Sequence, residues 1–108
     1  MKEFRNVIDV EHTLSKAEKV IIDFYSPSCV PCKRLDADLK NYEADPRYAG
    51  KLNVFRLNVE EYPQVSQRYG VTSLPTVMMF RRGVPDDNVL RGHSKKDLED
   101  FLRAYLAG

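Results

Sequence analysis

The hydrophobic pattern of this 108-residue chain alternates between short apolar runs and helical repeats. The strongest run is KVIIDFYS at residues 19–26, where Asp23 is the one polar residue between Val20 and Tyr25. A nearly continuous apolar run is typical of a strand that is buried on both faces of a sheet. Residues 51–59 and 76–83 contain similar runs and predict two further strands.

Helical periodicity is clearest at the carboxyl end, over residues 94–108. Ser94 can cap this helix, and its apolar residues share the spacing of one helix face: Leu98, Phe101, Leu102, Tyr105 and Leu106. Shorter helices are expected over residues 10–18 with Asp9 as the cap, over 31–43, and over 63–70.

The order of these elements defines the expected fold. A weak strand at residues 4–8 precedes the first helix, and residues 87–92 can return antiparallel after a turn at Gly83. The resulting order is β-α-β-α-β-α-β-β-α. Helices between successive strands favour parallel pairing, whereas the hairpin near Gly83 favours antiparallel pairing. We therefore predict an α/β protein with a central mixed β-sheet flanked by α-helices, in a single domain over residues 1–108.

Composition narrows the classes of function. Lys and Arg total 17 and Asp and Glu total 16, so a net charge of +1 offers no basic surface for nucleic acid or for anionic membranes. No segment approaches the roughly 20 apolar residues that a membrane span needs. The first residues also lack the apolar run of a signal peptide. We expect a cytoplasmic monomer that recognises its partners locally.

The only two cysteines, Cys29 and Cys32, lie three positions apart, where the strand at 19–26 meets the helix at 31–43. In a reducing compartment such a pair is more often catalytic or metal-binding than structural. The first helical turn presents free N–H groups and a positive dipole end, which stabilise a thiolate at Cys29. We predict that Cys29 attacks disulfides and that Cys32, more covered by the helix, resolves the mixed disulfide.

Asp23 and Pro75 extend this interpretation. A carboxyl group in a buried strand is costly to ionise, so its pKa should be raised, and beside the cysteine pair it can exchange a proton with Cys32. Pro75 stands at the entry of the strand at 76–83, where it removes no central hydrogen bond. An X–Pro bond at this position can be cis, although trans is the commoner state.

From about Val20 to Leu106 the chain resembles the thioredoxin family. The resemblance rests on VIIDFYSPSCVPCK, KLNVFRLNVEEYPQVSQRYGV, TSLPTVMMF and RGHSKKDLEDFL, in that order and spacing. It implies a thioredoxin fold and a thiol–disulfide oxidoreductase that reduces protein disulfides. It implies disulfide-containing proteins as substrates, a thioredoxin reductase as electron donor, and the Cys29–Cys32 disulfide in place of a separate cofactor.

The same resemblance implies roles for single residues. Asp23 would be the buried acid and base, and Pro75 would be a cis-proline. The backbone of Leu74 would pair with the substrate, and Gly92 would leave room for it. Arg56 stands where the family usually has a lysine and, if it points toward Asp23, would keep that carboxyl group more acidic.

Two departures fall in the active-site motif. Ser28 replaces the family's tryptophan and Val30 replaces its glycine, so Ser28, Val30 and Pro31 would form an altered contact surface for the substrate. Ala37 replaces a proline that commonly kinks the following helix. These changes affect partner choice and redox potential rather than the fold.

Other functions remain open on the same residues. A disulfide oxidant or isomerase would use the same fold, and the sequence between the cysteines does not decide against it. The pair could also supply two ligands to a metal ion or an iron–sulfur cluster shared across a dimer, since structural zinc takes four. We expect no metal site within one chain, because neither His12 nor His93 is spaced to join the pair, and His93 is interpreted as a solvated loop residue.

Overall fold

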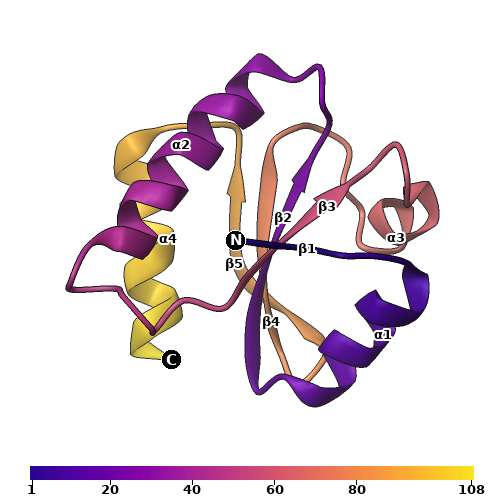
Figure 1. Cartoon of the computed structure of the whole chain (residues 1–108), viewed down its shortest axis with the longest axis horizontal. Coiled ribbons are helices and arrows are strands. Elements are labelled where there is room, and N and C mark those ends of the chain that lie inside the picture. Colours follow the sequence, from indigo (N-terminus) through magenta and orange to yellow (C-terminus); the bar gives the residue numbers. More distant parts are fainter.

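A five-stranded mixed β-sheet forms the centre of the computed structural model, which describes residues 1–108 (Figure 1). The strands are β1 (Lys2–Glu3), β2 (Lys19–Tyr25), β3 (Val54–Asn58), β4 (Thr76–Arg81) and β5 (Val84–Arg91). The helices are α1 (Val7–Lys16), α2 (Val30–Ala44), α3 (Pro63–Arg68) and α4 (Lys95–Ala107). The strand order is β1-β3-β2-β4-β5, with β1, β3 and β2 parallel and β4 antiparallel to both β2 and β5.

Helices cover both faces of this sheet. Helices α2 and α4 lie on one side, and α1 and α3 lie on the other (Figure 1). The predicted fold class, a mixed sheet flanked by helices, is confirmed. None of the helices is both long and apolar enough to cross a membrane.

Strand β2 occupies the middle of the sheet and contributes to two separate cores. Ile21 packs with the residues of α2 and α4, whereas Ile22 and Phe24 pack with those of α1 and α3. Side chains of a strand alternate between its two faces, so Asp23 points to the same side as Ile21, toward α2. Burial on both faces explains the nearly continuous apolar run in the sequence.

The amino-terminal prediction is wrong in two respects. The first strand is β1 at Lys2–Glu3, and the predicted strand at 4–8 instead leads into helix α1, which begins at Val7. Asn6, not Asp9, caps this helix, because its Oδ1 accepts a hydrogen bond from the Asp9 backbone N–H at 2.8 Å. Asp9 sits in the first turn, and its carboxylate accepts a hydrogen bond from the Arg5 backbone N–H at 3.1 Å.

The β4–β5 hairpin is tighter than expected. Arg82 and Gly83 both have positive φ, 51° and 80°, which makes a two-residue turn with the twist that hairpins favour. Strand β5 therefore begins at Val84, three residues before the predicted start. The pairing with β4 shifts register between Met78 and Phe80, and this irregularity takes up the extra length of β5.

Candidate active site

Cys29 and Cys32 form a disulfide at the junction between β2 and α2. Cys29 is the cap residue of α2, and its Sγ accepts a hydrogen bond from the Cys32 backbone N–H at 3.2 Å. Cys29 is partly exposed, whereas Cys32 is only 1% exposed. One sulfur can thus be reached from solvent while the other is covered by its own helix, which is the asymmetry expected from the sequence.

An exposed surface surrounds the disulfide. Ser28, Val30 and Pro31 are all exposed, and Val30 is one of three large hydrophobic side chains left in solvent, at 56% exposure. Pro31 lies in the first turn of α2, where its missing N–H leaves no internal hydrogen bond unmade. The helix begins one residue earlier than predicted, at Val30.

The loops before β4 and after β5 lie at the same end of the sheet as the disulfide. Phe24, near the end of β2, pairs with Thr76 at the start of β4, and Thr76 pairs with Arg91 at the end of β5. The Leu74–Pro75 peptide bond is cis. Pro75 is buried and Leu74 is partly exposed, and the Pro75 carbonyl accepts a hydrogen bond at 2.9 Å from the backbone N–H of Gly92.

Asp23 lies in a row of side-by-side residues that crosses four strands. In register, the row contains Glu3 of β1, Arg56 of β3, Asp23 of β2 and Val77 of β4. The Asp23 side chain is fully buried, and neither of its oxygens accepts a hydrogen bond from a donor group. Burial raises its pKa well above the ordinary value, and the neighbouring carboxyl of Asp36 raises it further.

Asp36 is a buried carboxylate that the sequence interpretation missed. It lies on α2 in a buried stripe that also contains Cys32, Leu35 and Leu39. Its Oδ2 is paired with the Arg56 guanidinium at 2.7 Å. A charged residue four positions after Cys32, within an apolar helical stripe, is the signal that could have identified it.

Arg56 acts mainly on carboxylates other than Asp23. It pairs with Asp36 and with Glu3, the latter at 2.6 Å, and its guanidinium carbon lies 3.8 Å from the centre of the Tyr25 ring. Its positive charge lowers the pKa of Asp23, but burial and Asp36 act more strongly in the opposite direction. Arg56 thus makes Asp23 more acidic, as expected, although the pKa of Asp23 stays raised overall.

His93 is not a solvated loop residue, so this interpretation is also wrong. Its side chain is 15% exposed, and its Nε2 lies 3.0 Å from the Asp38 carboxylate on α2. The contact joins the loop after β5, next to Gly92, to the active-site helix. Sequence could not anticipate this, because the fold brings the two residues together across a separation of 55 positions.

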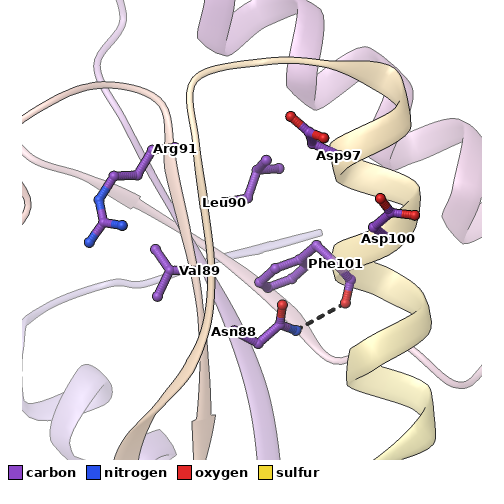
Figure 2. A pocket seen from close by; sticks show the side chains of 7 residues that line it. All are labelled: Asn88, Val89, Leu90, Arg91, Asp97, Asp100 and Phe101. Carbon is purple, nitrogen blue, oxygen red and sulfur yellow. Dashed lines mark hydrogen bonds between the residues drawn. The ribbon is translucent and has the colours of Figure 1, made fainter.

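A surface pocket lies away from the disulfide. Figure 2 shows it between β5 and α4, where Asn88 Nδ2 donates a hydrogen bond to the Phe101 carbonyl at 3.0 Å and Asp97 and Asp100 stand along the helix. Neither cysteine lines it, and neither do Asp23 and Pro75. Nor does the chain gather three or more His, Cys, Asp or Glu side chains in a geometry that could hold a metal ion.

Comparison with known proteins identifies relatives along nearly the whole chain. Residues 2–104 match the family model named Thioredoxin. Thioredoxin 1 of Nostoc sp. is 35% identical over 96 residues, which cover 89% of this chain and 88% of that protein. The chloroplastic thioredoxin M-type of Spinacia oleracea is 32% identical over 110 residues, 99% of this chain and 60% of that protein. The chain spans between 51% and 60% of the length of this relative and of two similar chloroplast proteins from Brassica napus and Pisum sativum.

Solved structures give the same architecture. The oxidised thioredoxin from Plasmodium falciparum has a TM-score of 0.85 to this structure, with 24% identity and coverage of 98% of both chains. This similarity supports the fold, and the sequence matches support the family. The chain belongs to the thioredoxin family.

Proposed function

We propose that this protein is a thiol–disulfide oxidoreductase that reduces protein disulfides by cycling Cys29 and Cys32 between dithiol and disulfide. The observation that carries the proposal is the placement of the pair: a partly exposed Cys29 caps a helix, and a buried Cys32 follows it within the first turn. Free N–H groups and the helix dipole at this end stabilise a thiolate on Cys29.

The first step is attack on the substrate. The Cys29 thiolate forms a bond to one sulfur of the substrate disulfide, and the substrate S–S bond breaks. The other substrate sulfur leaves as a thiolate and takes a proton from water. Cys29 is now joined to the substrate in a mixed disulfide, while Cys32 is still a thiol.

The second step releases the product. Cys32 gives its proton to the Asp23 carboxylate, and the resulting thiolate attacks Cys29. The Cys29–Cys32 bond forms, the bond from Cys29 to the substrate breaks, and the second substrate thiolate leaves. Two electrons pass from the protein dithiol to the substrate, and a dithiol donor must return them before the next cycle.

The substrate would lie across the exposed surface beside Cys29. Ser28, Val30 and Pro31 form one side of this surface, and Leu74, preceding Pro75, and Gly92 form the loops at the same end of the sheet. An extended substrate segment can pair with the backbone at Leu74. In this proposal Pro75 holds that backbone in place, and Gly92 leaves space for the segment.

The proposal includes partners and a location. Disulfide-containing proteins are the substrates, a thioredoxin reductase supplies electrons, and the protein works as a cytoplasmic monomer. The near-zero net charge favours partners that are recognised by local shape and by their disulfide rather than by long-range attraction.

Two cysteine variants test the chemistry, with insulin as the disulfide-containing probe and dithiothreitol as the reductant. Cys29→Ser should reduce insulin no faster than dithiothreitol alone. Cys32→Ser, reduced beforehand and mixed with insulin after the dithiothreitol is removed, should accumulate a mixed disulfide that mass spectrometry detects, because no second thiol of the protein resolves it. Ser15→Ala, an exposed change on α1, serves as the control. Full turnover by Cys29→Ser would refute the proposal.

The reduction potential separates a reductase from an oxidant or isomerase. We would equilibrate the protein in defined thiol–disulfide buffers and count free thiols by alkylation and mass. A potential near −270 mV, the value typical of reducing proteins of this fold, supports the reductase. A value near −120 mV would instead assign the oxidant.

A further inference from the structure

Helix α2 presents two functional side chains to the sheet, one turn apart. Cys32 and Asp36 are separated by four positions, so they lie on the same helix face, and both are buried. The same face packs on the sheet through Leu35 and Leu39, which join the core that contains Ile21. Asp36 therefore faces the side of β2 from which Asp23 projects.

Asp23 and Asp36 share one buried environment. Neither oxygen of Asp23 has a donor partner, and Asp36 Oδ1 has none either. After burial, the carboxyl group of Asp36 is the main cause that raises the pKa of Asp23. The other ionisable groups that face Asp23 are Arg56 of β3 and Glu3 of β1, whereas β4 contributes the apolar Val77.

One guanidinium cannot neutralise two buried carboxylates equally. Arg56 lies 2.7 Å from Asp36, whereas it makes no ion pair with Asp23. The Arg56 ion pair therefore favours the charged form of Asp36, and Asp23 is the carboxyl group of the two that accepts a proton. The negative charge of Asp36 repels that of an ionised Asp23 in a medium of low dielectric constant, so it strengthens the Asp23 carboxylate as a base.

We propose that Asp36, anchored by Arg56, is a positioning residue that keeps Asp23 a strong enough base to deprotonate Cys32. This inference rests on the proposed function. As Cys32 gives its proton to Asp23, the S–H bond breaks and an O–H bond forms, and the Asp36 charge stabilises the protonated product of that transfer. The new Cys32 thiolate then displaces the substrate sulfur from Cys29, and the electron pair of the broken S–S bond leaves with the substrate.

The test is the ionisation of Asp23 itself, followed by carbon NMR of its labelled carboxyl group against pH, in the oxidised and the reduced protein. In Asp36→Asn the midpoint for Asp23 should move to lower pH by about one unit or more, because a neighbouring negative charge is lost. In Asp36→Glu, which restores the charge, the midpoint should return toward the wild-type value. In Arg56→Met the last proton of the pair should leave at higher pH than in the wild type.

Asp38→Asn is the matched control, because it removes the same charge from the same helix at a carboxylate paired with His93 rather than Arg56. It should leave the Asp23 midpoint in place. A second measurement follows the resolving step, as release of the second thiolate when the dithiol form reacts with 5,5′-dithiobis(2-nitrobenzoate). Its pH–rate profile should move with the Asp23 midpoint in Asp36→Asn.

The two hypotheses fail in different ways. An Asp23 midpoint that is unchanged in folded Asp36→Asn, or that moves equally in Asp38→Asn, would overturn the role of Asp36 even if insulin reduction is normal. If the midpoint moves as expected but wild-type protein reduces no insulin, the proposed function fails and the link between the carboxyl groups stands. If Asp36→Asn does not fold, Asp36→Ala takes its place: an Asp23 midpoint at lower pH than in the wild type supports the role of Asp36, and an unchanged midpoint overturns it.

Discussion

At the scale of single residues, Asp23 makes stability depend on pH. Its pKa is raised in the folded protein above the ordinary value of 3.8, chiefly by burial. The folded state therefore binds more protons than the unfolded state between these two pKa values. Stability from this group is fully present below the unfolded pKa and is lost as pH rises through the folded one.

Replacement of Asp23 removes this pH dependence. Relative to wild type, Asp23→Asn should gain about 1.4 kcal/mol of unfolding free energy for each pH unit between the unfolded and the folded pKa. Urea denaturation of the oxidised proteins across a pH series measures the difference. Asp87→Asn, an exposed change, should show a flat difference. A flat difference for Asp23→Asn as well would contradict the raised pKa.

The residues of the site differ in how far sequence could reveal them. Cys29 and Cys32 are the only cysteines, and Asp23 stands out as a charge in an apolar run, so all three were found. Asp36 and His93 were not, because an aspartate in a helix and a histidine in a loop are usually solvated. Their partners come from distant segments, and only the assembled fold brings these groups together.

At the scale of elements, the hydrophobic pattern predicted best those helices and strands that are extensively buried in the folded protein. Strand β2 and helix α4 have continuous patterns because each buries a complete face or stripe. The strand predicted at residues 4–8 is wrong, because Asn6 caps a helix that begins at Val7, within the predicted strand. A short segment has too few apolar positions to distinguish the helical repeat of about 3.6 residues from the strand repeat of two.

The turn between β4 and β5 supplies a prediction at this scale. Gly83 has positive φ, and a side chain there would place Cβ 3.0 Å from the Leu14 carbonyl oxygen of α1. Gly83→Ala should therefore destabilise the protein by more than the roughly 1–2 kcal/mol that left-handed backbone costs an alanine.

Gly70→Ala is the control for that change. Gly70 has a similar φ of 69°, but no atom lies within 4 Å of the added Cβ. The loss of stability in Gly70→Ala therefore measures only the cost of positive φ for an alanine. Urea unfolding measures the free energy of unfolding of both variants. Equal losses in the two would show that the Leu14 carbonyl group adds no steric cost at Gly83.

At the scale of the whole molecule, one sheet joins two hydrophobic cores. Ile21 and Ile22 are neighbours in β2 and project into opposite cores, and both are fully buried. The sheet lies between the two cores, and its strands are joined to one another by backbone hydrogen bonds. We therefore expect the chain to unfold as one cooperative unit.

Truncation in either core tests this cooperativity. Ile21→Ala and Ile22→Ala should each cost about 2–5 kcal/mol, the usual range for a buried isoleucine. Far-UV circular dichroism and tyrosine fluorescence should give coincident urea transitions in both variants, while Ile8→Ala, at a side chain 79% exposed, should change stability by less than about 0.5 kcal/mol. Two separated transitions would show that the cores unfold independently.

The outer strands of the sheet affect how this protein behaves among other chains. An open sheet edge is a template on which foreign strands can add and start aggregation. Here one edge, β1, is only two charged residues long, and the other, β5, contains Pro85 and a shift in register. Such edges resist growth. If the protein reduces disulfides in other proteins as proposed, these edges let it contact their chains without adding their strands to its sheet.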